Sequence, residues 1–133
     1  MKERHDLVSG WLRKAKSDLV ALDASRDAGA YDAAAFHAQQ AVEKLLKAYL
    51  VKVNIEFPFT HNLARLVELC QIADITFVDL LPIVEPLTPY AVELRYDADF
   101  WPTEEDVSEA RLIAVDVWDF VLRRLPPETI QID

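Results

Sequence analysis

Apolar side chains recur at steps of three and four residues along most of this chain, which is the spacing of one face of an α-helix. The pattern is widest between Phe36 and Leu50, where small and larger apolar residues fill two neighbouring helix faces. These residues are Ala34, Ala38, Ala41, Leu45 and Ala48 on one face and Val42, Leu46, Tyr49 and Leu50 on the other. A helix that is apolar over so wide an arc usually packs against more than one element.

A polar stripe follows the same helix at the same three- and four-residue spacing. It consists of His37, Gln40, Lys44 and Lys47. One interpretation is a solvated helix face, which is the usual role of charged side chains on a helix. The other is a group of side chains that carries chemistry, and the pattern alone leaves both open.

The first half of the chain is predicted to form a helical hairpin. Helices are expected over residues 3–26 and 30–53, and the break at Asp27–Gly29 is so short that the two must pack antiparallel. Gly29 can take the left-handed conformation found just past many helix ends. Trp11 lies on the predicted inner face of the first helix, and we expect it to be largely buried against the second helix.

Helix caps and prolines organise the middle of the chain. Thr60 is expected to cap a helix from His61 to Ile72, and Thr76 is expected to cap the next element. The following segment contains three prolines, each of which would remove a hydrogen bond inside a helix. They are Pro82, Pro86 and Pro89. We therefore expect a short helix at 77–81, an irregular passage, and a helix at 88–95 that has a proline in its first turn.

The last helix is predicted to begin after Thr103, because this residue can cap it and acidic residues follow at the positive end of the helix dipole. It should run to about Leu125, and residues 126–133 are expected to be a C-terminal tail. The sequence therefore predicts one all-α domain over residues 1–125. Its expected architecture is an up-and-down, antiparallel four-helix bundle with an extra short helix.

The charge is negative and unevenly distributed. The formal net charge is −9, from 14 Lys and Arg against 23 Asp and Glu. Residues 1–52 carry nine cations and seven anions, a balance of +2, whereas residues 53–133 carry five and sixteen, a balance of −11. Phosphate affinity comes from Lys and Arg, so free-standing DNA or RNA binding is not expected. A basic partner would suit the second half better.

Other sequence signals limit the class of protein. The single cysteine, Cys70, excludes an internal disulfide, and its apolar surroundings predict a buried thiol. The three histidines, His5, His37 and His61, have no His or Cys partner at metal-ligand spacing, so we expect neither a metal site nor another cofactor. The N-terminus is too charged for a signal peptide, and no stretch approaches the about 18 apolar residues that span a bilayer, so we expect a cytoplasmic protein.

Four segments, taken in order, resemble the HEPN (higher eukaryotes and prokaryotes nucleotide-binding) domain family. They are the helix WLRKAKSDLVAL at 11–22, the helix FHAQQAVEKLLKAYL at 36–50, the loop and helix start FPFTHNLARL at 57–66, and the pair Arg95-Tyr96. The resemblance covers roughly residues 7–124. It implies the same helical bundle.

The resemblance also implies partners. It implies a homodimer, often encoded with a small nucleotidyltransferase that the bundle complements or restrains in a toxin–antitoxin-like pair. It further implies a nucleotide or other phosphate-bearing ligand in a groove near the dimer interface. The residues add support for a dimer, because Trp118 and Phe120 lie about 160° apart on the last helix and cannot both face one core.

The family contains metal-independent ribonucleases, whose mark is an Arg separated from a His by four to six residues. Here the corresponding Arg95 is followed by Phe100, Trp101 and Pro102 at those positions, and no other Arg in the chain meets the spacing. We therefore expect a non-catalytic binding module. One alternative is a ribonuclease toxin with a displaced site, in which His61 meets Arg95 in space. Another is a structural adaptor without a ligand.

The candidate nucleotide- or phosphate-binding residues are basic or hydrogen-bonding side chains of these segments. They are Lys44, Lys47, His61, Arg95 and Tyr96, with His37 and Gln40 as secondary candidates. Two of them have simpler alternatives: His61 can orient its own loop, and Arg95 can pair with Asp97 or Asp99 nearby. No catalytic residue is assigned.

Overall fold

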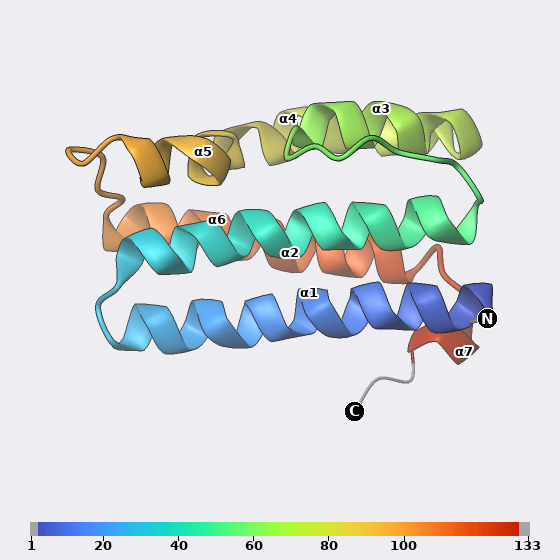
Figure 1. Ribbon diagram of the computed structural model, residues 1–133, viewed down its shortest axis with the longest axis horizontal. Coiled ribbons are helices and arrows are strands. Elements are labelled where there is room, and N and C mark those ends of the chain that lie inside the picture. Colours follow the sequence, from blue (N-terminus) through green and yellow to red (C-terminus); the bar gives the residue numbers. More distant parts are fainter. Residues whose placement is uncertain (1–2, 131–133) are drawn as a thin grey trace.

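The computed structural model describes residues 3–130, apart from the side chain of Arg95, and Figure 1 shows its arrangement as a bundle of roughly antiparallel helices. Within that range all regular elements are helical, as predicted. They are α1 (Arg4–Asp27), α2 (Tyr31–Lys52), α3 (Leu63–Ala73), η1 (Ile75–Leu80), α4 (Leu81–Val84), η2 (Glu85–Leu87), α5 (Pro89–Tyr96), α6 (Glu104–Leu122) and α7 (Pro127–Ile130), where η denotes a 3₁₀-helix.

The hairpin of α1 and α2 forms as predicted. The chain reverses at Gly29, whose φ of 78° is a conformation that side-chain-bearing residues rarely adopt. Figure 1 shows α2 at the centre of the molecule, between α1, α6 and the row of short helices that ends in α5. Both apolar faces of α2 are buried, since its alanine row and its larger apolar row are each at most 5 % exposed. The central position explains why this helix is apolar over so wide an arc.

The face of α1 that the apolar spacing predicts is largely buried, with Trp11 as an exception. Leu12 is completely buried, whereas Trp11 is only partly buried and packs at the edge of the core. The expectation that Trp11 is largely buried was therefore wrong. Its indole meets Phe57 edge-to-face, with ring centroids 6.5 Å apart, because the loop after α2 covers this side of α1.

The proline-rich segment is more regular than expected. Instead of an irregular passage it is a row of short 3₁₀ and α pieces, η1, α4, η2 and α5. Pro82, Pro86 and Pro89 each occupy the first or second position of a new piece, where no helical hydrogen bond is required of them. The row returns along α2 and forms the fourth member of the bundle, while α3 is the extra short helix (Figure 1).

The run Ile75–Leu94 within this row has a mean hydropathy of 1.3 and passes, by length and composition, as a membrane-spanning helix. The expectation that no stretch of the chain is long and apolar enough to span a membrane was therefore wrong. The prolines, however, divide the run into short pieces, and its large side chains Phe77, Leu80 and Leu87 lie in the core of the bundle. A core segment of a globular bundle has the same composition.

Two helix caps differ from the prediction. Asn62, not Thr60, caps α3, because its Oδ1 accepts a hydrogen bond from the amide of Arg65. Thr60 instead accepts from the amide of Asn62 and shapes the loop before the helix. At η1 the capping oxygen belongs to Asp74, which accepts from the amide of Thr76.

The last long helix begins as predicted. Thr103 and Asp106 form a capping box, in which each side chain accepts from the other residue's amide. The helix ends at Leu122, and the expected tail contains the short helix α7. This helix packs beside the start of α1, where the hydroxyl of Ser9 donates to the carbonyl oxygen of Thr129 at 3.1 Å.

Candidate functional site

The polar stripe of α2 is not a solvated face. Its side chains are covered by α1 and by the loop at 57–62. Lys47, for example, is only 6 % exposed. Two further polar side chains of α2 are buried beside it, Gln39 at 0 % and Glu43 at 3 % exposure. Because buried charges are costly unless they are paired, the stripe must be read together with its partners.

The first of two clusters, here the Asp18 cluster, joins α1 to α2. Asp18 comes from α1 and is buried, and its two carboxylate oxygens contact two residues of the α2 stripe. Nζ of Lys44 donates to Oδ2 at 2.6 Å, and Nδ1 of His37 lies 2.9 Å from Oδ1. The lysine balances the charge of the carboxylate, and the carboxylate fixes the histidine ring.

The second cluster, here the Glu43 cluster, repeats this arrangement one turn further along α2. Nζ of Lys47 donates to Oε2 of Glu43 at 3.0 Å, and Nδ1 of His61 lies 2.8 Å from Oε1. The amide of Gln39 donates to the carbonyl oxygen of His61 at 3.2 Å, which holds the loop against the helix. The amide of Gln40 donates to Oε1 of Gln39 at 2.7 Å.

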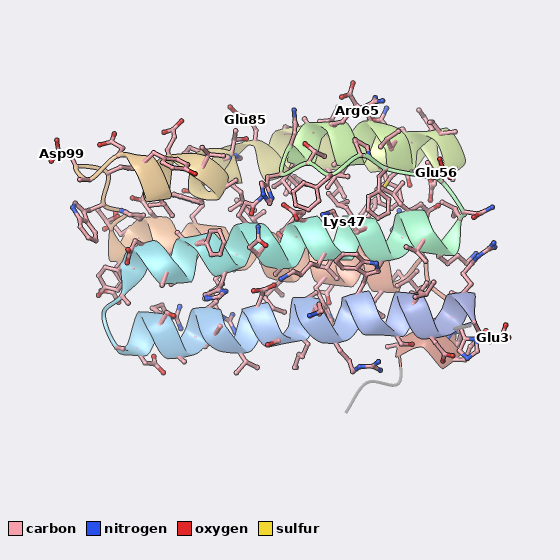
Figure 2. All side chains as sticks on the ribbon, viewed as in Figure 1. Glu3, Lys47, Glu56, Arg65, Glu85 and Asp99 are labelled. Atoms are coloured by element: carbon pink, nitrogen blue, oxygen red, sulfur yellow. The ribbon has the colours of Figure 1, made fainter. Side chains whose placement is uncertain are left out.

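Aromatic rings surround the ammonium group of Lys47, which belongs to the second half of α2 (Figure 2). Its Nζ is 5.5 Å from the ring centroid of Trp11, 5.8 Å from that of Phe57 and 5.9 Å from that of Phe59. Such rings attract a cation through their negative faces. Lys47 is therefore held by one carboxylate and three rings, and it is not free to meet a ligand directly.

The geometry sets the roles of the two nitrogens of His61. An ionised carboxylate can only accept, so Nδ1–H of His61 donates to Glu43 and the other ring nitrogen is left for a further partner. The side chain of Glu43 is 4 % exposed, while that of His61 is 39 % exposed. A buried acid thus orients a histidine whose outer edge meets solvent.

His61 lies on the rim of a hollow of about 460 Å³ between the loop before α3 and helix α5. Hydrogen-bonding groups of Thr60, Asn62 and Thr88 also line the hollow. Phe59, which is 95 % exposed, stands beside the histidine, with ring centroids 5.9 Å apart. The hollow therefore combines one oriented imidazole, several small polar groups and an uncovered aromatic ring.

The structure brings some of the sequence-predicted residues together and leaves others apart. It brings His37 and Lys44 into the Asp18 cluster, and Gln40, Lys47 and His61 into the Glu43 cluster. Tyr96 is 81 % exposed at the end of α5 and, within the described part of the chain, shares no hydrogen bond or ion pair with either cluster. The backbone of Arg95 lies in the same last turn of α5, and its side chain is outside the described residues.

Three residues that the sequence analysis did not select hold these clusters together, namely Asp18, Gln39 and Glu43. A signal was present in the sequence. Asp18 stands three residues after Ala15 and four before Leu22, so it lies on the buried face of α1. A polar residue at such a position requires a partner from another element.

Other chemistry is limited among the described residues. They contain no group of three or more His, Cys, Asp or Glu side chains placed to hold a metal ion. Cys70 is buried, and desolvation raises the pKa of its thiol to about 12, so it is not a nucleophile at neutral pH. The thiol is structural, as expected.

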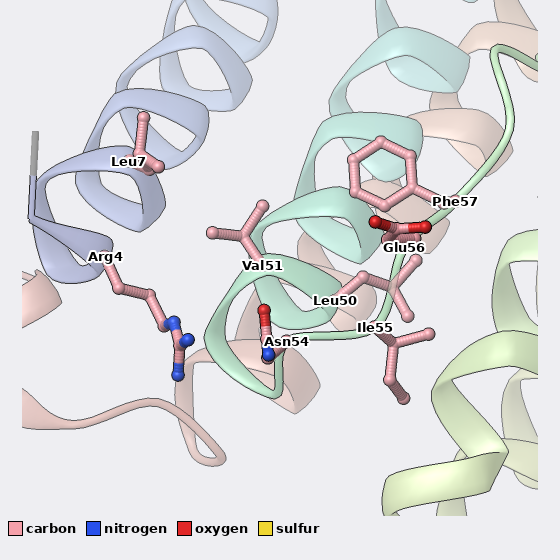
Figure 3. A pocket seen from close by; sticks show the side chains of 8 residues that line it. All are labelled: Arg4, Leu7, Leu50, Val51, Asn54, Ile55, Glu56 and Phe57. Carbon is pink, nitrogen blue, oxygen red and sulfur yellow. The ribbon is translucent and has the colours of Figure 1, made fainter. Parts of the chain in front are cut away.

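A second hollow, of about 420 Å³, lies between the start of α1, the end of α2 and the loop that follows α2 (Figure 3). Figure 3 shows apolar side chains such as Leu50, Val51 and Ile55 along its walls and Arg4 at its edge. It has no counterpart of the oriented histidine, so the hollow at His61 is the stronger candidate site.

Comparisons with known proteins agree on one family. A sequence model described as the HEPN domain matches residues 8–125. Among solved structures, the crystal structure of an archaeal HEPN homologue superposes with a TM-score of 0.73 at 24 % identity, over 93 % of this chain and 98 % of the other. This likeness shows the shared fold. A search of curated proteins finds no significant match.

Proposed function

Because the chain belongs to the HEPN domain family, which it matches over residues 8–125, we propose that it is a non-catalytic binding module whose ligand site is the hollow beside His61. The ligand is a nucleotide or another small phosphate-bearing molecule. A single observation carries this proposal: the buried carboxylate of Glu43 holds Nδ1 of His61 at 2.8 Å, and His61 itself lines the hollow.

The electrostatics of the Glu43 cluster support anion binding. Lys47 already balances the charge of Glu43, so a protonated His61 leaves the cluster with one net positive charge. Its outer N–H can then donate a charge-assisted hydrogen bond to a phosphate oxygen. Asn62 and Thr88 provide neutral donors in the same hollow. In this proposal Lys44 and Lys47 act through the carboxylates that orient the histidines, while Arg95 and Tyr96 flank the site from α5.

Titration calorimetry tests the ligand site. ATP, GTP and short oligonucleotides are titrated into the wild type, into His61→Ala and into His5→Ala, an exposed histidine of α1 that serves as the matched control. We expect at least one phosphate-bearing ligand to bind, His61→Ala to abolish binding, and His5→Ala to leave it unchanged. If no ligand binds below about 1 mM, or if both variants behave alike, the site assignment is wrong.

A homodimer and a nucleotidyltransferase partner belong to the same proposal. Three exposed apolar side chains support a contact face at the turn from α3 to η1, since such clusters often mark interfaces. They are Ile72, Ile75 and Val78, at 73 %, 68 % and 42 % exposure. Light scattering should give about twice 15.2 kDa at micromolar concentration, and Ile72→Glu should shift this toward one chain. A wild-type monomer would contradict the dimer.

One observation favours a second function, a metal-independent ribonuclease. A histidine oriented by a buried acid can serve as a general acid or base toward a ribose hydroxyl or a leaving oxygen. The test is incubation with mixed RNA in the presence of a chelator. Cleavage that disappears in both His61→Ala and Arg95→Ala but persists in His5→Ala would replace the binding-module proposal.

A further inference from the structure

The turn between α5 and α6 presents a second surface, separate from the Glu43 cluster. Two aromatic side chains stand out there, Tyr96 at 81 % and Trp101 at 67 % exposure. Exposed carboxylates lie around them in the sequence, and Figure 2 shows one of these residues, Asp99, at the outer tip of the turn. We define the end surface by six residues, Tyr96, Asp97, Asp99, Trp101, Glu104 and Glu105.

The end surface is built on an anchored turn. Beneath it, Phe100 stacks on Tyr90 of α5, with ring centroids 6.1 Å apart and planes at 14°. Pro102 is buried next to Trp101, and the capping box of Thr103 fixes the start of α6. Aromatic side chains that are exposed on a fixed backbone lose little conformational freedom on binding, so a partner can use their area efficiently.

The charge of the end surface determines which class of partner it can bind. Residues 95–110 contain six acidic residues and one basic residue, Arg95, so the segment carries a net charge of −5. A nucleic acid or an anionic membrane would meet like charge. A second copy docked across a two-fold axis would place the same acidic patch against itself, which is also repulsive. A positively charged protein segment is the complementary occupant.

We propose that the end surface docks a Lys- and Arg-rich segment of a partner protein that also carries apolar side chains. The carboxylates attract and orient the basic side chains, and the tryptophan and tyrosine provide the apolar contact on which affinity depends. Arginine can in addition stack on the face of Trp101. This docking is distinct from ligand binding in the hollow at His61, because it uses the opposite sign of charge and shares only Tyr96, which flanks both surfaces.

The probe is a fluorescein-labelled synthetic peptide that alternates arginine with leucine, followed by fluorescence anisotropy. We expect it to bind the wild type and a peptide of alternating glutamate and leucine not to bind. Trp101→Ser should weaken binding about tenfold or more. The matched control is Leu112→Ser, an equally exposed apolar residue of α6 at 64 %, which should change little.

The charge contribution is tested by a second pair of variants. Glu104→Gln with Glu105→Gln should weaken binding and reduce its dependence on salt between about 0.05 M and about 0.5 M. Asp116→Asn with Asp119→Asn removes the same charge from exposed positions further along α6 and should do neither. His61→Ala should leave peptide binding unchanged, whatever its effect on nucleotides.

Several outcomes would overturn the docking proposal. One is binding of the arginine–leucine peptide no tighter than about 1 mM. Another is an equal loss in Trp101→Ser and Leu112→Ser. Light scattering supplies a third, because conversion of a dimer to a monomer by Trp101→Ser would show that a second copy covers the end surface.

Discussion

The Glu43 cluster and the end surface handle charge in opposite ways. In the Glu43 cluster a carboxylate, a lysine and a histidine are drawn together under aromatic cover, and the lysine and the acid are almost completely buried. At the end surface, acids of the turn stay exposed beside uncovered aromatic rings. Paired charges inside the bundle fix one side chain, His61, whereas the exposed carboxylates of the end surface are proposed to select a basic partner.

The largest effect on stability is expected when Glu43 is replaced. Glu43→Ala leaves the buried ammonium of Lys47 without its carboxylate and releases His61, so the free energy of unfolding should fall by about 3–5 kcal/mol. Urea denaturation measures this change. Glu109→Ala, at an exposed position of α6, is the control and should alter it by less than about 0.5 kcal/mol. Equal effects would mean that Glu43 does not support the fold.

The two regions each contain a tryptophan, and the stability costs of replacing these tryptophans should differ. Trp11 packs on Phe57 and Lys47 at the edge of the core, so Trp11→Ala should cost about 2–3 kcal/mol, less than the about 3–5 kcal/mol of a fully buried ring. Trp101→Ala should change stability by less than about 0.5 kcal/mol. Thermal or urea melts of both variants give the comparison, and a costlier Trp101 change would show that this ring is not free for a partner.

A smaller effect is expected in acid at an ion pair outside both regions. Arg111 of α6 hydrogen-bonds to Asp23 of α1, and this hydrogen bond lowers the pKa of the Asp23 carboxyl. Because the folded-state pKa lies below the unfolded one, the stability from this pair is present above about pH 4 and is lost as the pH falls through the folded value. In urea melts below about pH 4, the free energy of unfolding of Asp23→Asn should therefore depend less on pH than that of the wild type. An unchanged profile would contradict this contribution.

Much of the fold follows from the sequence, because apolar spacing and capping residues report on local structure. The hairpin at Gly29, the faces of α2 and the cap at Thr103 were all predicted. The helix that follows Pro89 was predicted as well. The helical pieces that begin around Pro82 and Pro86 were not, because each proline counts against a long helix but is well tolerated in the first turn of a short one. Trp11 is less buried than expected because it lies at the edge of the buried face of α1, and periodicity does not distinguish the edge of a helix face from its centre.

The candidate site was predicted less completely than the fold. The stripe of α2 contained residues that do come together, but their partners lie on other elements and could not be assigned from spacing. Asp18 reaches the stripe from α1, and His61 reaches Glu43 from a loop 18 residues further along the chain. Polar residues on buried faces, such as Asp18 and Glu43, are the signal that would have located both clusters.

The most direct test of the account follows the rings of the three histidines, His5, His37 and His61, by NMR while ATP is added. If Glu43 holds His61 ready for a phosphate-bearing ligand, the ring signals of His61 should move in proportion to the ligand bound. Those of exposed His5 should stay in place, and Glu43→Gln should reduce the movement at His61. Signals that all remain fixed, or that shift equally at His5 and His61, would contradict the central claim.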